Sequence, residues 1–167
     1  RARTRVRLST TTKAELHWWQ TFLQAQRLRP MEAKFRCAEL SVTATDASSH
    51  QLAGVLLTDP SFPCFSIPLS RRQKRLHINV KEMMAVCKAV AHFDRRLRGT
   101  PLNIRTDSMT VVHAINRWGT KQDGIRPLLR QLFEWALLTE TKVTATCVPT
   151  GGNTFADNLT RGKAITS

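Results

Sequence analysis

Apolar and polar side chains alternate along residues 39–47 in the pattern of a β-strand. Apolar residues occupy every second position from Leu40 to Ala44, which is the two-residue period of a strand. Two further apolar runs, at 51–58 and 64–69, are bounded by turn residues and predict two more strands. Because the connections between these three runs are short, we expect an antiparallel meander.

A helical period of apolar residues follows the meander. It predicts a helix from Val80 to about Leu97, with Asn79 as its N-cap. Cys87 lies on the apolar side of this helix and is therefore expected to be a buried thiol. The charged segment Arg71–Arg75, which precedes the helix, is expected to be a loop.

The rest of the chain continues the alternation of strands and helices. A capping box at residues 12–15 predicts a first helix that ends before Pro30. Two more strands are predicted at 102–107 and 141–148, and three more helices at 108–115, at 125–138 and after Asn153.

This order of elements restricts the fold. Strand–helix–strand crossings require parallel pairing, whereas the early meander requires antiparallel pairing. The sequence therefore predicts an α/β fold with a five-stranded mixed sheet, three antiparallel strands followed by two parallel ones, and helices on both faces. The strands at 39–47 and 102–107 are expected to be central neighbours. Residues 37–163 are expected to form this domain, between a basic tail with a connecting helix at 1–36 and a short tail at 164–167.

The charge of the chain points to a polyanionic partner. Among 167 residues, 26 Lys and Arg stand against 12 Asp and Glu, which gives a net charge of +14. Such a field attracts nucleic acid or anionic membranes. No apolar run approaches the ~20 residues that cross a bilayer, so we expect nucleic acid as the partner and no membrane.

The cysteines argue against a zinc site. Cys37, Cys64, Cys87 and Cys147 are far apart and include no C-x-x-C pair. Reduced cysteines and the lack of a secretory signal predict an intracellular protein, in the cytoplasm or nucleus. Because the sequence starts at Arg1 rather than Met, we expect it to be a fragment or a processed product.

Four acids stand where folding could bring them together: Asp46, Glu82, Asp107 and Asp157. Asp46 and Asp107 each end a predicted strand in Thr-Asp followed by small polar residues. Mg²⁺ prefers such hard oxygen ligands, and two ions about 4 Å apart can promote phosphodiester hydrolysis. Singly, each acid also fits a turn, a capping box or a helix start. Those local roles do not explain why two neighbouring strands end alike.

Several segments together resemble the ribonuclease H family. They are residues 77–86 (HINVKEMMAV), 104–108 (IRTDS), 114–119 (AINRWG) and 153–161 (NTFADNLTR). The last is similar to the family ending N-x-x-A-D-x-L-[ST]-R, and the order of elements and the acid series also fit. The resemblance covers about residues 12–162. It is nearest to the RNase H domain of retroelement reverse transcriptases, of the LTR type or, by LHWW at 16–19, the tyrosine-recombinase DIRS/VIPER type.

The resemblance implies an RNase H-like fold and cleavage of the RNA strand of RNA–DNA hybrids during reverse transcription, leaving 5′-phosphate ends. It implies two Mg²⁺ ions, which Mn²⁺ could replace. By this resemblance Asp46 would bridge both ions, and Asp157 would join it at the ion that activates the attacking water. Glu82 and Asp107 would hold the ion at the leaving 3′ oxygen. The implied partners are the hybrid and the adjacent reverse transcriptase domain of the same polyprotein.

Ten further residues are candidates for contact with substrate. They are Ser48, Arg71, Arg72, Lys74, Arg75, Asn79, Ser108, Arg117, Trp118 and Lys121. The basic ones would contact phosphates. The loop at 116–124 is too short for the basic protrusion with which some cellular family members hold substrate, and these residues would take its place. The alternative for them is a solvated surface, and for Trp118 it is packing against the fold.

The chain departs from the family at Cys147. The family usually carries a histidine ten residues before its last Asp, on a mobile loop, where it helps proton movement or product release. A neutral thiol is a poor substitute for imidazole at pH 7. We therefore expect slower turnover rather than loss of activity.

Two rival hypotheses stay open. The chain could be a domesticated, non-cleaving RNase H-like module that binds nucleic acid or scaffolds a ribonucleoprotein, although retention of all four acids argues against this. It could also be another metal nuclease on the same fold, such as a junction resolvase or integrase, to which the local segments are less similar.

Overall fold

The structure, a computed structural model, describes residues 7–25, 39–149 and 154–161. The predicted helix end before Pro30, the thiol of Cys37 and the predicted cap at Asn153 lie outside these residues. The chain divides into two compact units, residues 1–33 and 34–167.

The first unit contains helix α1, Thr10–Ala25. Its N-cap is Ser9, since the backbone N–H of Thr12 donates to Ser9 Oγ over 3.1 Å. The prediction of a capping box that begins at Thr12 is therefore wrong, because a hydroxyl one turn earlier takes the role. Within the helix, Trp18 stacks on Phe22 with ring centroids 5.1 Å apart, as residues four apart do on one face.

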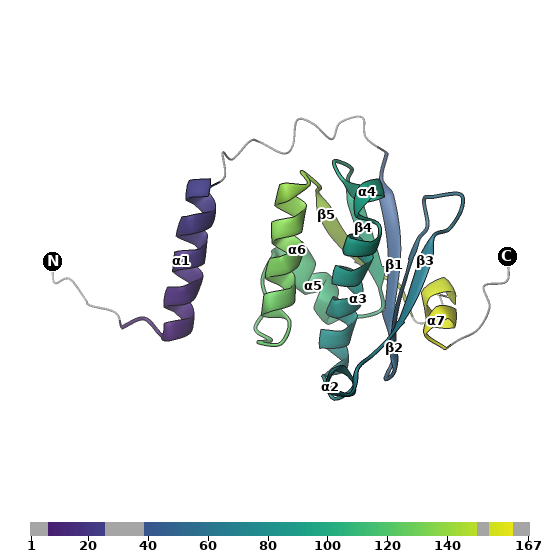
Figure 1. The fold of residues 1–167 in the computed structure, drawn as a ribbon, viewed down its shortest axis with the longest axis horizontal. Coiled ribbons are helices and arrows are strands. Elements are labelled where there is room, and N and C mark those ends of the chain that lie inside the picture. The colour runs from purple at the N-terminus through teal and green to yellow at the C-terminus, as the bar shows by residue number, and fades with distance from the viewer. Residues whose placement is uncertain (1–6, 26–38, 150–153, 162–167) are drawn as a thin grey trace. The chain divides into compact units, whose positions relative to one another are not determined.

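The second unit is built on the predicted five-stranded mixed sheet (Figure 1). Its strands are β1 (Ser41–Ala47), β2 (Gln51–Leu56), β3 (Cys64–Pro68), β4 (Leu102–Thr106) and β5 (Val143–Cys147). Their order is β3-β2-β1-β4-β5. The first three pair antiparallel, while β4 pairs parallel with both β1 and β5. The predicted fold class and the central pairing of β1 with β4 are both confirmed.

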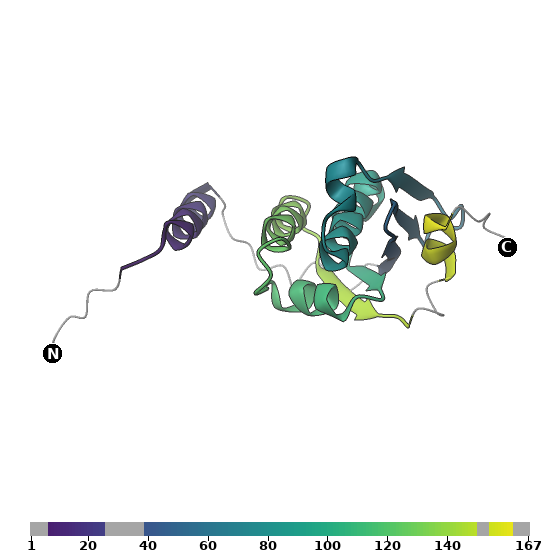
Figure 2. The same ribbon diagram turned by 90° about the horizontal axis from the view of Figure 1, so that it is seen from below.

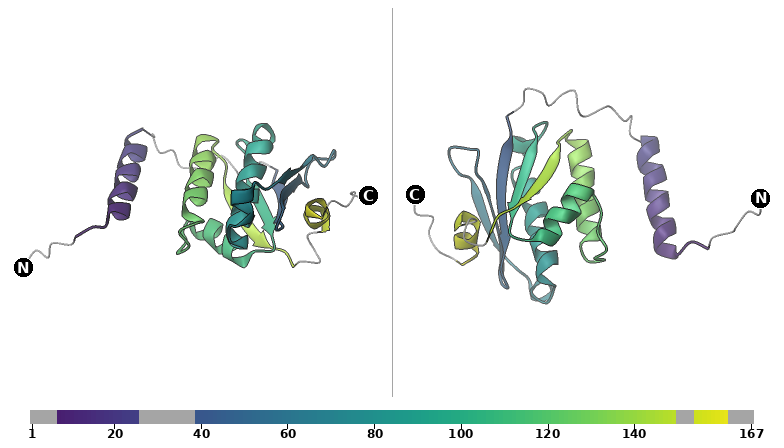
Figure 3. Two further views of the ribbon diagram at one scale, coloured as in Figure 1. Left: turned by 60° about the horizontal axis from the view of Figure 1, so that its bottom comes forward. Right: turned by 180° about the vertical axis from the view of Figure 1, so that it is seen from behind.

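Helices cover both faces of this sheet, as predicted (Figure 2). The larger core lies under α3 (Ile78–His92), α5 (Met109–Arg117) and α6 (Arg126–Leu138). The opposite face carries α7 (Thr154–Thr160), which contacts β1, β2 and β3 (Figure 3). There Ala156 packs against Ala44 and Val55 in a much smaller cluster. Among its described side chains, few apolar contacts therefore hold α7, and polar contacts to it carry more weight.

The long helix predicted from Val80 to Leu97 differs from the observed structure at both ends. It begins at Ile78 because His77 Nδ1, rather than the Asn79 side chain, accepts the capping N–H. It also breaks at Phe93, which is buried and separates α3 from α4 (Asp94–Leu97). The prediction of a buried Cys87 thiol on this helix is confirmed, and burial raises the pKa of that thiol to about 12.

The basic segment before α3 is a short helix, α2 (Arg71–Lys74), and not a loop. A capping box starts it: the Gln73 N–H donates to Ser70 Oγ over 3.3 Å, and the Ser70 N–H donates to Gln73 Oε1 over 2.9 Å. Lys81 Nζ donates to the carbonyl of Lys74 over 2.9 Å. The basic side chains therefore project from an ordered helix that is attached to α3.

The exposed edge of β5 is covered by one side chain. Asn116 Nδ2 donates to the Ala145 carbonyl and Asn116 Oδ1 accepts the Ala145 N–H, each over 2.8 Å. This pair of bonds imitates the next strand of a sheet and satisfies groups that another chain would otherwise pair with. It also anchors β5 two residues before Cys147.

Candidate metal centre

Three acids from distant parts of the chain meet at the carboxyl end of the central strands. Asp46 lies on β1, Glu82 in α3 and Asp107 just after β4, and one oxygen of each lies within 4.8 Å of the others. The register explains the pairing of the two aspartates. Ala44 of β1 is opposite Arg105 of β4, so two residues further on Asp46 comes beside Asp107.

Glu82 lies between the ends of the two strands. It is only 3 % exposed. Its Oε1 accepts the N–H of Ala47 over 3.0 Å, and its Oε2 accepts the hydroxyl of Thr106 over 3.3 Å. The helix that carries Glu82 packs across β1 and β2, which places this carboxylate under the strand ends.

The electrostatic setting of these acids is unfavourable without a cation. Burial, followed by the charges of Asp46 and Asp107, raises the pKa of Glu82 to about 8. Burial also raises the pKa of Asp46, partly offset by a hydrogen bond from Thr160. Within residues 39–149 and 154–161, no ion pair neutralises any of the three acids. A divalent cation would supply the missing charge, and three carboxylates are a hard-oxygen donor set suited to one.

The fourth predicted acid, Asp157, is not part of this trio. It lies on α7, and its Oδ1 is 2.8 Å from Arg161 Nε. Its charge nonetheless contributes to raising the pKa of Asp46, so the two carboxylates are electrostatic neighbours. Thr160 lies between Asp46 and the backbone of α7: its hydroxyl is 2.5 Å from Asp46 Oδ2 and 3.0 Å from the backbone carbonyl of Asp157.

Three candidate substrate residues have local structural roles. Ser108 caps α5 by accepting the Val111 N–H over 3.4 Å. Ser48 Oγ accepts the Gln51 N–H over 3.0 Å in the turn between β1 and β2. The third, Asn79, donates from Nδ2 to the hydroxyl of Thr110 over 3.3 Å, which links α3 to α5.

The other candidate substrate residues are exposed. They are Arg71, Arg72, Lys74 and Arg75 on or beside α2, and Arg117, Trp118 and Lys121 after α5. Trp118 ends α5 in a left-handed conformation (φ 48°) and packs edge-on against Phe133, with ring centroids 5.0 Å apart. Its side chain still stays 36 % exposed, so packing leaves part of the ring accessible.

Cys147 ends β5 beside the acidic trio. Its Sγ lies 3.7 Å from the backbone carbonyl of Asp107, to which the thiol donates. The three described cysteines are all free.

Sequence reasoning missed the polar side chains that hold the acids. Thr106 and Thr160 donate to Glu82 and Asp46, and Arg161 pairs with Asp157. A signal existed for each: Thr106 directly precedes Asp107, and Thr160 and Arg161 are the final pair of the NTFADNLTR segment.

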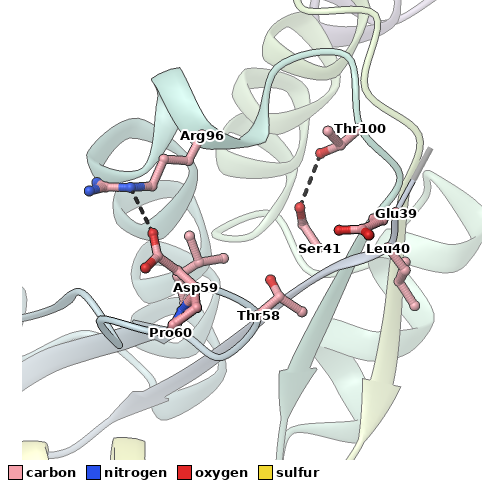
Figure 4. Close-up of a pocket in the computed structure, with 9 residues that line it drawn as sticks. Glu39, Leu40, Ser41, Thr58, Asp59, Pro60, Arg96 and Thr100 are labelled. Carbon is pink, nitrogen blue, oxygen red and sulfur yellow. Dashed lines mark hydrogen bonds and ion pairs between the residues drawn. The ribbon is translucent and has the colours of Figure 1, made fainter.

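A pocket of about 540 Å³ with a mixed polar and apolar lining lies at the other end of β1 (Figure 4). Its lining includes the ion pair of Arg96 with Asp59, 3.0 Å apart, and the hydroxyls of Ser41 and Thr100, 3.2 Å apart. The pocket is lined by residues near the start of β1, whereas Asp46 is near its end. It is therefore separate from the metal centre.

A match to a model of a known protein family shows to which family this chain belongs. Residues 39–139 match the model of the RNase H-like domain found in reverse transcriptase. The chain belongs to this family. The match contains Asp46, Glu82 and Asp107 and ends before β5, so the last strand and α7 of this RNase H-like domain are placed by structure rather than by the family match.

Solved structures share the RNase H-like fold. RNase H1 of Halobacterium salinarum has a TM-score of 0.57 at 20 % identity, over 72 % of this chain and 94 % of its own. The N-terminal RNase H domain of a Mycobacterium tuberculosis protein has a TM-score of 0.59 at 19 % identity, over 75 % and 98 %. LC11-RNase H1, solved in complex with RNA/DNA hybrid, has a TM-score of 0.58 at 16 % identity, over 74 % and 94 %. No curated protein matches this RNase H-like domain in sequence.

None of the helices in the described ranges is long and apolar enough to span a bilayer.

Proposed function

We propose that this RNase H-like domain is a metal-dependent endoribonuclease that cleaves the RNA strand of RNA–DNA hybrids during reverse transcription of a retroelement. The observation that carries the proposal is the trio of Asp46, Glu82 and Asp107, two of them buried, which no ion pair within the described residues neutralises, in a chain of net charge +14. A stable fold gains nothing from gathering these carboxylates, whereas a site for cations beside a polyanion requires it.

The proposed cofactors are two Mg²⁺ ions, which Mn²⁺ could replace. Asp46 would contact both, Glu82 and Asp107 would share one, and Asp157 would join Asp46 at the other. When bound, the ions would activate water and stabilise the leaving oxygen. The chain itself fixes Glu82 between two strand ends through Ala47 and Thr106. Because burial and the neighbouring aspartates raise the pKa of Glu82 to about 8, this side chain would give up a proton on binding a cation.

The basic helix α2 and the segment after α5 are proposed to hold the hybrid. Exposed guanidinium and ammonium groups of Arg71, Arg72, Lys74, Arg75, Arg117 and Lys121 would contact phosphates. The accessible part of Trp118 would pack against sugar. Asn79 shares α3 with Glu82, whereas Ser48 directly follows β1 and Ser108 directly follows Asp107. Choice of RNA would come from contacts to 2′-hydroxyls.

The setting of the domain is also proposed. Residues 1–36 would be the end of the polymerase or connection region, residues 37–163 the RNase H domain and residues 164–167 a tail. The neighbouring reverse transcriptase domain of the same polyprotein would then be its partner, and its place of action would be intracellular.

Cleavage of labelled substrates by the purified chain tests the proposal. RNA–DNA hybrid should be cut in Mg²⁺, with 5′-phosphate ends on the RNA fragments, and not in EDTA. Duplex DNA and duplex RNA of the same sequence should stay intact. Mg²⁺-dependent cutting of duplex DNA instead would favour the resolvase or integrase class of nuclease.

Restoring a histidine at position 147 should increase the rate. In Cys147→His an imidazole that titrates near neutral pH replaces the thiol beside Asp107, and turnover should rise roughly ten-fold. Single-turnover and steady-state cleavage of hybrid measure the gain. Cys147→Ser is the matched control and should stay close to the parent rate. Equal rates for all three chains would show that the side chain at position 147 does not limit turnover.

Cys147 also favours one alternative function, a non-cleaving module that binds nucleic acid. Such a module would bind hybrid through the same basic surface and would not cut it in either Mg²⁺ or Mn²⁺. Binding without cleavage, unchanged in Cys147→His, would establish that alternative.

A further inference from the structure

We propose that Thr160 is a positioning residue: its hydroxyl orients the carboxylate of Asp46 for cation binding and makes that binding depend on the docking of α7. The inference rests on the proposed function, because it takes Asp46 as a metal ligand. Thr160 lies 114 residues from Asp46 in sequence, and no local pattern would connect the two.

The contact is short, buried and charge-assisted. Thr160 is 7 % exposed, and its Oγ1 lies 2.5 Å from Asp46 Oδ2. The same hydroxyl lies 3.0 Å from the carbonyl of Asp157. A hydroxyl has one proton to donate, and the ionised carboxylate is the stronger acceptor. The proton therefore goes to Asp46 while α7 is docked, and the carbonyl of its own helix is the remaining acceptor when it is not.

This bond opposes the repulsion within the acidic trio. The terminal torsion of an aspartate is soft, and oxygens of Glu82 and Asp107 lie within 4.8 Å of an oxygen of Asp46. Without a partner, the carboxylate would rotate away from the other acids. A carboxylate oxygen has two lone pairs, so a hydrogen bond to Oδ2 fixes the plane of the group and still leaves positions for a cation.

The same bond contributes to holding α7 on the sheet. The helix has seven residues, fewer than the ~12 that an isolated helix needs. Its described apolar anchor is the small residue Ala156, packed against Ala44 and Val55. The hydroxyl of Ser66 donates weakly to the Leu159 carbonyl over 3.4 Å. Thr160 is thus a main link between α7, which carries Asp157, and the strand that carries Asp46.

Thr160→Val and Thr160→Ser separate the hydroxyl from the shape of the side chain. Valine keeps the shape and removes the donor, whereas serine keeps the donor. Titration calorimetry without substrate measures the affinity of the full chain for Mn²⁺. This affinity should fall roughly ten-fold or more in Thr160→Val and change little in Thr160→Ser. Amide hydrogen exchange over residues 154–160 should be faster in Thr160→Val alone.

Thr43→Val is the matched control. Thr43 is fully buried on the same strand as Asp46, and its hydroxyl has no hydrogen-bond partner among the described residues. Its replacement should leave both Mn²⁺ affinity and exchange of α7 unchanged.

The outcomes are distinguishable. If the parent chain binds Mn²⁺ and Thr160→Val binds it with the same affinity, this inference is overturned and the proposed function still stands. The inference also fails if Thr160→Ser loses as much affinity as Thr160→Val, because the methyl group and not the hydroxyl would then matter. A parent chain that binds no Mn²⁺ overturns the proposed function and this inference together.

Discussion

Asp107→Asn is expected to remove hybrid cleavage while the protein stays folded. The substitution takes a charged oxygen from the trio that it forms with Asp46 and Glu82. The loss should exceed the roughly 100-fold that follows removal of a mere hydrogen-bond partner of a metal ligand. The fold should survive because Asp107 is only half-buried, and asparagine suits the same position after a strand. Cleavage of labelled hybrid in Mg²⁺ and a thermal melt measure the two effects.

Asp123→Asn is the control for charge alone. The Asp123 side chain is 89 % exposed and pairs only at the surface with Arg126, 3.2 Å away, and such pairs contribute little. Both variants raise the net charge equally, so a general effect on hybrid binding would appear in both. A cleavage rate in Asp107→Asn equal to that in Asp123→Asn would mean that the metal centre lies elsewhere.

The metal-free protein is expected to lose stability as the pH rises from about 4.5 to about 8. The pKa of Glu82 is raised from 4.5 to about 8 by burial and by the neighbouring aspartates. Between these values the folded state holds a proton that the unfolded state has lost, so the free energy of unfolding falls with increasing pH. The fall should be on the order of 5 kcal/mol, since each pKa unit corresponds to about 1.4 kcal/mol. Burial raises the pKa of Asp46 as well, which adds a loss of the same sign.

Glu82→Gln should abolish most of this pH dependence. The neutral amide still accepts the Ala47 N–H through its oxygen and carries no charge to bury, so the variant should be more stable than the parent at pH 8 in EDTA. Saturating Mg²⁺ should stabilise the parent at pH 8 and have much less effect on the variant. Urea unfolding at pH 5 and pH 8, with and without Mg²⁺, provides the comparison. Parallel pH profiles for parent and variant would contradict the assignment of this titration to Glu82.

The sheet was predictable because its signals are local. Alternation marked β1, short connections marked the meander, and the crossover rule placed β4 beside β1. The meeting of Asp46 with Asp107 followed from that pairing alone. Errors arose where two nearby residues competed for one role. His77 rather than Asn79 caps α3, and Ser9 rather than Thr12 caps α1.

The supports of the acids were not predictable from periodicity. The burial of Glu82 between Ala47 and Thr106 depends on how a helix packs across two strand ends. The break between α3 and α4 at Phe93 contains no glycine or proline that would have predicted it. It follows from burial of the Phe93 ring in the core. Helix α2 had a readable signal, since Ser70 and Gln73 have capping-box spacing, but the run of basic residues suggested a solvated loop.

The hydrogen bond between Thr160 and Asp46 has a consequence for biosynthesis. Ribosomes add residues from the N-terminus at about 5–20 per second, so the nascent chain contains Asp46, Glu82 and Asp107 for some seconds before its final helix is made. All three acids of the trio are present in that interval, yet the bond from Asp46 to Thr160, 114 residues away, cannot form. Under the proposed function, a ribosome-bound intermediate would be a poor nuclease, and cellular hybrids would be spared until translation of the domain is complete.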